Sequence, residues 1–110
     1  MTRSESKGGN TMGKYVYIYY AGTASDGGTA EEWGKWFGEL GDKLVDGGNP
    51  FAEGGKAVND DGVMDVQDNP ATGYSIITAA DIDEATALAK GCPLVIAKSG
   101  AVCVYEALPM

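Results

Sequence analysis

The 110 residues of this chain include no histidine, and this limits the chemistry that its side chains can perform. Histidine is the commonest general acid and base and the commonest metal ligand, so a hydrolytic triad and a histidine-ligated metal centre are excluded. Two cysteines, Cys92 and Cys103, form no CxxC motif. We interpret both as small buried hydrophobic residues. No catalytic residue and no metal site is therefore predicted.

Carboxylates are the next candidates, and they cluster at Asp60, Asp61, Asp65 and Asp68. Oxygen ligands of this kind could hold a calcium ion, but their spacing departs from that of an EF-hand loop. Solvated aspartates in turns are the favoured interpretation. The glycines match neither GxGxxG nor GxxxxGK[ST], so no phosphate-binding loop and no cofactor is predicted.

One group of aromatic and hydroxyl side chains could form a ligand cleft between a sheet and the first helix. The candidates are Tyr17, Tyr19, Trp36 and Ser75. Their rings could hold a small apolar molecule while the hydroxyls orient it. The alternative is that the same residues only fill the core of a dimer.

The first element that positions these residues is a strand over residues 14 to 20, KYVYIYY. Side chains alternate between the faces of a strand, which puts Tyr15, Tyr17 and Tyr19 on one face and Val16, Ile18 and Tyr20 on the other. We expect Val16 and Ile18 to face the helices. The three tyrosines would then lie on an open sheet face, and they are the candidates for a dimer interface.

A helix from Ala30 to about Val45 is predicted by a capping box at Thr29 and Glu32. Its apolar stripe consists of Trp33, Trp36, Phe37, Leu40 and Leu44. Beside this stripe lies a strip of glycines, Gly34, Gly38 and Gly41, which we interpret as sites of close backbone approach.

A second helix is predicted after Asp81, which pairs with Glu84 in another capping box. Gly91 is positioned as its C-cap, and Pro93 prevents its continuation. Strands are predicted over residues 73 to 80 and 101 to 107 on either side of this helix.

The central region is the least regular, and the string NDDG at 59 to 62 predicts a hairpin turn there. This turn would pair strands near 55 to 58 and 63 to 67. The element order is then strand, helix, strand or hairpin, strand, helix, strand. It predicts an α+β fold, the ferredoxin-like βαββαβ sandwich, with two helices on one face of an antiparallel sheet.

Composition limits the partners. A formal net charge of -8 and a pI near 4.2 disfavour binding to nucleic acid or to anionic lipid. No apolar run approaches the ~20 residues that span a bilayer, and residues 1 to 10 are polar where a signal peptide would be apolar. We therefore expect a cytoplasmic protein without membrane contact. Residues 1 to 13 are expected to be a flexible arm or a remnant of cloning, and residues 14 to 110 a single domain.

The strings GYSII, AADIDEA and LAKGCP, followed by VYEA, resemble the YCII-related family, also called the DGPF-domain family. KYVYIYY and EEWGKWFGELGDKLVDGGNPF extend the resemblance over most of residues 14 to 108. It implies a dimeric α+β barrel, in which two ferredoxin-like subunits pack sheet to sheet. Some members carry a histidine and an aspartate proposed as an acid/base pair, which this chain cannot form. The nearest string to the DGPF signature is Gly48-Asn49-Pro50-Phe51, and no role is assigned to Asn49 from it.

Two functions follow from these observations. The first is a non-catalytic module that forms a homodimer through the open sheet face and binds a small molecule or serves as an accessory protein. The alternative is a small cofactor-independent enzyme, of oxygenase, isomerase or lyase type, that uses a cleft of the dimeric barrel without a histidine. The two differ in whether Tyr17, Ser75 or a loop carboxylate converges on a closed cavity with a perturbed pKa.

Overall fold

The computed structural model describes residues 12 to 20, 28 to 66 and 70 to 109. In chain order the elements are β1 (Gly13–Tyr20), α1 (Ala30–Leu40), the 3-10 turn η2 (Gly41–Lys43), β2 (Leu44–Asp46), β3 (Lys56–Asn59), β4 (Gly62–Asp65), β5 (Gly73–Ala79), α2 (Ile82–Ala89), α3 (Pro93–Ile96) and β6 (Ala101–Ala107). Most of the predicted N-terminal arm lies outside the described residues, while Gly13 already belongs to β1.

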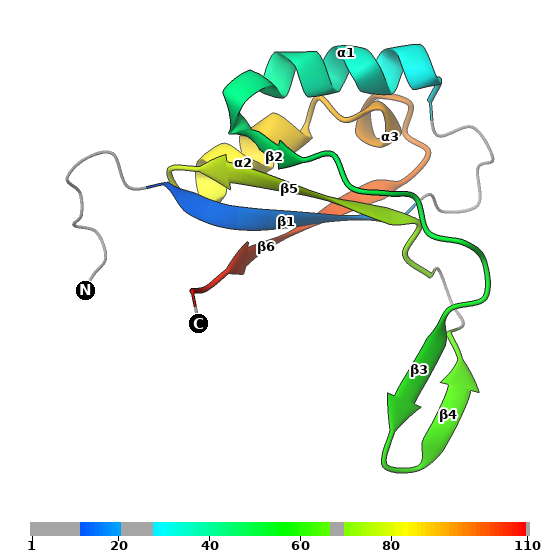
Figure 1. Cartoon of the computed structure of the whole chain (residues 1–110). Coiled ribbons are helices and arrows are strands. Elements are labelled where there is room, and N and C mark those ends of the chain that lie inside the picture. The colour runs from blue at the N-terminus through cyan, green and yellow to red at the C-terminus, as the bar shows by residue number, and fades with distance from the viewer. Residues whose placement is uncertain (1–11, 21–27, 67–69, 110) are drawn as a thin grey trace.

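Four strands form one antiparallel sheet in the order β2-β5-β1-β6, and the helices cover one of its faces (Figure 1). With β3 and β4 set aside, this order is that of the ferredoxin-like sandwich. The predicted α+β fold class is confirmed. The strands β3 and β4 pair only with each other in a two-stranded sheet, which extends away from the helix layer on the side of the uncovered sheet face (Figure 1).

The second strand of the main sheet is not where the sequence placed it. Residues 44 to 46, predicted as the end of the first helix, form the edge strand β2. The helix ends at Leu40 because Gly41 takes a φ of 57°, which breaks the helical conformation. The predicted hairpin is confirmed, since β3 pairs with β4 about a turn at Asp60 and Asp61, but it stands apart from the main sheet.

Both predicted N-caps are confirmed. The Thr29 hydroxyl accepts from the Glu32 N–H at 3.1 Å, and the Glu32 carboxylate accepts from the Thr29 N–H at 2.8 Å. The Asp81 carboxylate accepts from the Glu84 N–H at 2.8 Å. The Glu84 carboxylate differs from the expected box, because it accepts from the N–H of Ala80 instead of Asp81. These side chains satisfy backbone donors that the first turn of a helix leaves unpaired.

Two interpretations of glycines are wrong. A Cβ at Gly34, Gly38 or Gly41 would meet nothing within 4 Å, so this strip faces open space and makes no close approach. Gly91 is not a left-handed C-cap. Its role is to admit the Trp36 indole, which would lie 3.0 Å from a Cβ there. Pro93 does not continue α2 and occupies the first position of α3.

The predicted assignment of faces on β1 is also wrong. Tyr15, Tyr17 and Tyr19 are 2%, 0% and 5% exposed and lie beneath the helices, so they do not form an open-face interface. Val16 and Ile18 lie on the uncovered face instead. Alternation separates the two sets correctly, but it does not say which set meets the helices.

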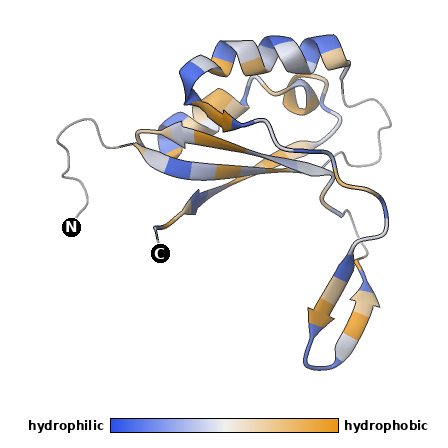
Figure 2. Cartoon of the chain, viewed as in Figure 1, coloured by the Kyte–Doolittle hydropathy of each residue, from blue (hydrophilic) through white to orange (hydrophobic). Residues whose placement is uncertain are grey.

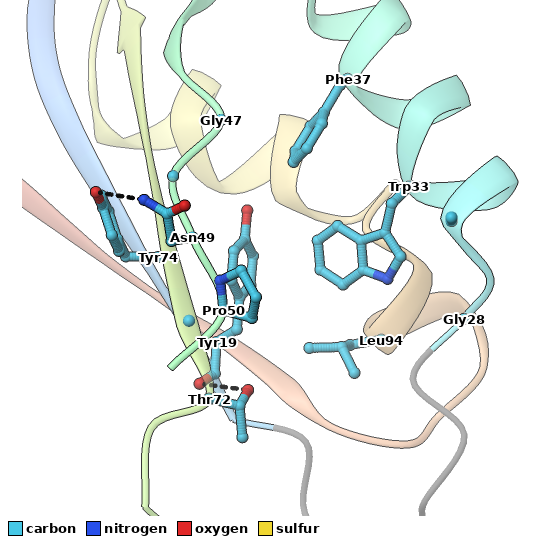
Figure 3. A pocket seen from close by; sticks show the side chains of 13 residues that line it. Tyr19, Gly28, Trp33, Phe37, Gly47, Asn49, Pro50, Thr72, Tyr74 and Leu94 are labelled. Atoms are coloured by element: carbon cyan, nitrogen blue, oxygen red, sulfur yellow. Dashed lines mark hydrogen bonds between the residues drawn. The ribbon is translucent and has the colours of Figure 1, made fainter. Parts of the chain in front are cut away.

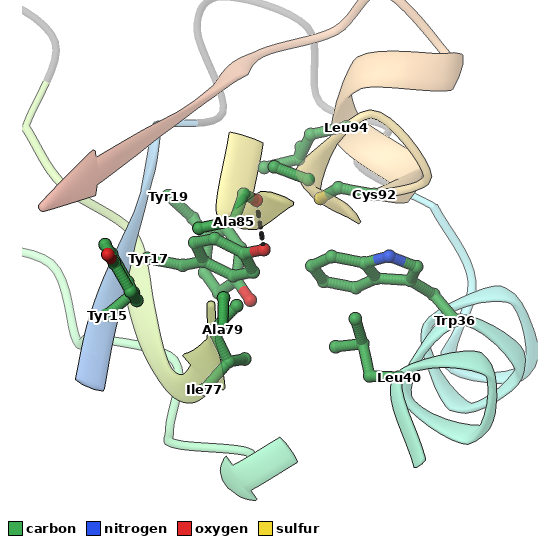
Figure 4. Packing of buried hydrophobic residues seen from close by; sticks show 11 residues of the cluster. Tyr15, Tyr17, Tyr19, Trp36, Leu40, Ile77, Ala79, Ala85, Cys92 and Leu94 are labelled. Atoms are coloured by element: carbon green, nitrogen blue, oxygen red, sulfur yellow. Dashed lines mark hydrogen bonds between the residues drawn. The ribbon is translucent and has the colours of Figure 1, made fainter. Parts of the chain in front are cut away.

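Tyrosine suits the covered face because its polar end finds a partner there (Figure 4). The Tyr17 ring stacks on Trp36 with ring centroids 5.8 Å apart and planes 17° apart, and its hydroxyl donates to the Ala85 carbonyl at 2.6 Å. The Trp36 indole N–H donates to the Leu88 carbonyl at 3.1 Å. Buried aromatic rings with satisfied polar ends therefore join β1, α1 and α2.

Among the described residues, no helix is long and apolar enough to cross a membrane.

Burial raises the pKa of Tyr17 and of Tyr19, so the folded protein should lose stability at alkaline pH. Above about pH 10 the unfolded chain releases phenolic protons that the folded chain keeps, and the free energy of unfolding falls as the pH rises. We expect a loss of about 1 kcal/mol for each tyrosine at about pH 11, measured by urea unfolding across a pH series. The Tyr17→Phe/Tyr19→Phe variant should lose less than wild type, because it lacks the two buried phenols. Equal pH dependence in the two proteins would contradict this account.

Candidate functional site

A pocket of about 510 Å³ opens between α1 and the segment that follows β2. Trp33 and Phe37 of α1 form one side, Pro50 lies on the opposite side, and Leu94 lies below Trp33 (Figure 3). Tyr19 of β1 lies between the two sides, where its ring contacts Trp33. Gly28, Ala30 and residues 47 to 49 and 72 to 74 complete the lining. None of these lining residues carries a charged side chain, so the pocket suits an uncharged molecule.

The two walls differ in kind, and the α1 wall is aromatic. Tyr19 meets Trp33 edge to face at a centroid distance of 5.0 Å and an angle of 82°. Trp33 in turn meets Phe37 at 5.9 Å and 63°. Residues 33 and 37 are one helical turn apart, which places both side chains over the same part of the sheet. Such an arrangement offers ring faces and edges to a flat apolar molecule.

The other wall is a backbone segment, residues 47 to 51, held against the residues that lead into β5. The Phe51 N–H donates to the Thr72 carbonyl at 2.8 Å, and the Tyr74 N–H donates to the Asn49 carbonyl at 3.3 Å. The Asn49 side-chain amide is a longer 3.5 Å from the Tyr74 hydroxyl. This pairing continues the edge of the sheet beyond β2 and fixes the wall.

Gly48 permits the close approach of this wall to β5. It has a φ of 76°, and a Cβ at this position would lie 1.7 Å from the Tyr74 carbonyl oxygen. Its N–H donates to the Asp46 carboxylate at 2.8 Å. No residue with a side chain fits this conformation and this space together.

Two consecutive hydrogen bonds, the first of them buried, tie the same wall to β1. The Tyr19 hydroxyl donates to the Ser75 hydroxyl oxygen at 2.7 Å, and Ser75 donates to the Gly47 carbonyl at 2.7 Å. Burial raises the pKa of Tyr19, an effect that the Ser75 hydrogen bond partly opposes. The Tyr19 phenol therefore keeps its proton at neutral pH and acts here as a structural donor.

The structure brings the four predicted cleft residues together, but it places only one of them at the pocket. Tyr17 and Trp36 stack, Tyr19 meets Trp36 at 6.3 Å, and Ser75 holds the Tyr19 hydroxyl. Tyr19 lines the pocket, whereas Tyr17, Trp36 and Ser75 are buried behind it. Ligand binding at these residues stays a prediction.

Several pocket residues were missed by the sequence reasoning. The helical stripe contained Trp33 and Phe37, but stripe positions usually pack in the core and carry no separate signal for a pocket. The segment around Asn49 and Pro50 shows no periodicity. The one sequence feature that marks this segment is the string Gly48-Asn49-Pro50-Phe51, the nearest match in the chain to the DGPF signature, and this string alone indicates no role in a pocket.

The other candidates for chemistry have structural explanations. Cys92 is fully buried and burial raises the pKa of its thiol, while Cys103 on β6 is partly exposed. Asp65 forms an ion pair with Lys56 across the hairpin. Asp68 lies outside the described residues. Within the described parts of the chain, no three potential metal ligands of the His, Cys, Asp and Glu types come together.

We expect Gly48→Ala to destabilise the protein and to open the pocket wall. The matched control is Gly54→Ala, because Gly54 also has a positive φ, of 91°, but open space around its Cβ position. The control should cost about 1 kcal/mol from backbone strain alone. Gly48→Ala should cost at least about 2 kcal/mol more, since overpacking adds to that strain. Urea unfolding of both variants measures the difference, and equal losses would contradict the close approach.

Comparison with protein families matches residues 12 to 110 to the YCII-related domain. This range includes every strand and helix described above, as well as the pocket. Searches of curated proteins and of solved structures find no significant match. The sequence resemblance is thus confirmed by an independent comparison, and the chain belongs to the YCII-related family.

Proposed function

We propose that this chain is a non-catalytic homodimeric module that binds a small, flat, uncharged molecule in the pocket between α1 and residues 47 to 50. The observation that carries this proposal is the pocket lining, which is aromatic and apolar and has no charged side chain among the residues that the structure describes. A pocket of about 510 Å³ falls within the size range of small-molecule sites. Binding here would rest on burial of apolar area and on ring contacts.

Binding is favoured over catalysis by the chemistry of the lining. General acid/base catalysis needs a group whose pKa lies near the working pH. Tyr19 and Tyr74 are the titratable side chains among the described lining residues. Tyr19 has a raised pKa, and its hydroxyl proton is committed to Ser75. These features support a binding site over the alternative of a cofactor-independent enzyme.

The homodimer is supported by the uncovered face of the sheet. Cross-strand pairing places Val16 beside Ile76 and Tyr105, and Ile18 beside Cys103, on this face. The chain has 16 acidic residues, but its three long strands contain only Glu106, which pairs with Tyr15 and so shares the covered face. Asp46 of the edge strand β2 pairs with Ile76, so the carboxylate-free part of this face is the surface of the three long strands. Such a surface in so acidic a chain suits association with a second copy. The two free thiols also fit a reducing compartment such as the cytoplasm.

Filling the pocket should abolish binding without removing any core contact. Ala30 and Glu31 are adjacent and both exposed, but only Ala30 lines the pocket, so Ala30→Phe is the blocking variant and Glu31→Phe its control. Neutral indole and its negatively charged carboxylate derivative are matched probes. We expect indole to raise the melting temperature of wild type and of Glu31→Phe, by several degrees at saturation, and to leave Ala30→Phe unchanged. Equal responses in both variants, or a preference for the anion, would contradict the proposed site.

Dimerisation should protect Cys103 from thiol reagents, because its side chain lies on the uncovered sheet face. Cys92 contributes little background, since it is fully buried and has a raised pKa. We expect the modification rate of Cys103 to fall several-fold as protein concentration rises through the dimer dissociation constant. The Cys103→Ser variant should lose the fast signal. A rate independent of concentration, in a range where light scattering reports a dimer, would place the interface elsewhere.

A further inference from the structure

Each strand of the β3–β4 hairpin contains hydrophobic residues (Figure 2). Val58 and Val63 face each other across the strands on one side, and Ala57 and Met64 do so on the other. Val58 is 74% exposed, Val63 67% and Met64 47%. A two-stranded hairpin is only marginally stable in water without cover for its apolar side chains. The exposed apolar side chains of the hairpin are therefore typical of a surface that contacts another protein.

The position of the hairpin identifies what could cover it. It extends from the edge of the main sheet on the side opposite the helices, where the uncovered face lies (Figure 1). Its root is joined to that face, because the Phe51 ring stacks on Tyr74 at 5.8 Å and 23°. Tyr74 pairs with Ile18, whose side chain shares the uncovered face. A body seated on the uncovered sheet would lie directly beside the hairpin.

Charge favours a second copy of this chain as that body. The turn of the hairpin carries Asp60 and Asp61, whereas the uncovered face carries the cation Lys14. The long strands β1, β5 and β6 present no carboxylate on that face, where Asp46 of the edge strand β2 pairs with Ile76. Two copies could thus meet at these surfaces without the repulsion that a net charge of -8 would otherwise cause. A strongly basic partner would find no acidic patch on the sheet face.

We propose that the β3–β4 hairpin is an arm that packs its exposed valines against a second copy seated on the uncovered sheet face. The inference rests on the proposed homodimer and adds a second contact region to it. In the dimer the apolar side chains of each arm are buried against the other subunit. Each subunit is thereby contacted beyond the edge of its sheet. Each arm buries apolar area that the sheet contact alone leaves in water.

The test is the dimer dissociation constant, measured by sedimentation on the full chain. We expect Val58→Asp to raise this constant by about tenfold or more. Val58→Thr/Val63→Thr, which keeps strand-forming residues, should raise it less but measurably. The matched control is Ile96→Asp, because Ile96 is 69% exposed on α3 and lies in the helix layer, away from the arm. This control should dimerise like wild type, and near-ultraviolet circular dichroism should show intact aromatic packing in all variants.

A second reference variant, Ile18→Asp on the sheet face, separates failure of the arm from failure of the dimer. If Ile18→Asp weakens the dimer and Val58→Asp does not, the arm is overturned and the sheet interface stands. If Val58→Asp weakens the dimer and Ile18→Asp does not, the copy does not sit on the sheet face, which also overturns the inference. If Ile96→Asp weakens the dimer as much as Val58→Asp does, the added negative charge alone explains the loss, and the arm is overturned. A wild-type protein that stays monomeric at about 100 μM would overturn both the proposed dimer and the arm.

Discussion

The stack of Tyr17 on Trp36 holds three elements in register, and the rest of the structure depends on it. The two rings join β1 to α1, and both polar ends are bound to carbonyls of α2, at Ala85 and Leu88. Since a buried hydroxyl or indole N–H without a partner is costly, the three elements can meet in few ways. With Trp36 fixed, helical geometry directs Trp33 and Phe37 over the neighbouring end of the sheet, where they line the pocket.

Local signals in the sequence were enough for most of the fold. Capping residues such as Thr29 and Asp81, the turn at Asp60 and Asp61, and alternation in the strands each act over a few residues, and the structure contains all of them. The errors concern choices that only tertiary contacts decide. Both faces of β1 are apolar, so alternation could not show that tyrosine, with its hydroxyl, is the better match to the helix layer. Similarly, Leu44 fits a helical stripe as well as an edge strand, and the conformation of Gly41 decides between them.

The candidate site was less accessible to sequence reasoning than the fold. Tyr19 was identified because hydroxyl and aromatic side chains are conspicuous, yet the wall opposite α1 consists largely of backbone from an irregular segment. Gly48 illustrates the difficulty, because its importance depends on the position of the Tyr74 carbonyl, which is 26 residues away in the chain. No short-range pattern reports such a contact. A glycine is equally common in an open turn, as at Gly54.

One feature of the architecture connects the helix layer to the far side of the sheet. Residues 47 to 51 form the wall of the pocket and also the root of the hairpin, through the Phe51 and Tyr74 rings. A molecule that fixes this segment would leave the hairpin less conformational entropy to lose on meeting another protein. Thermodynamic reciprocity then requires that the meeting strengthen retention of the molecule by the same factor. In the proposed dimer, this short stretch of chain would make occupancy of the pocket and assembly of the two copies two variables of one equilibrium.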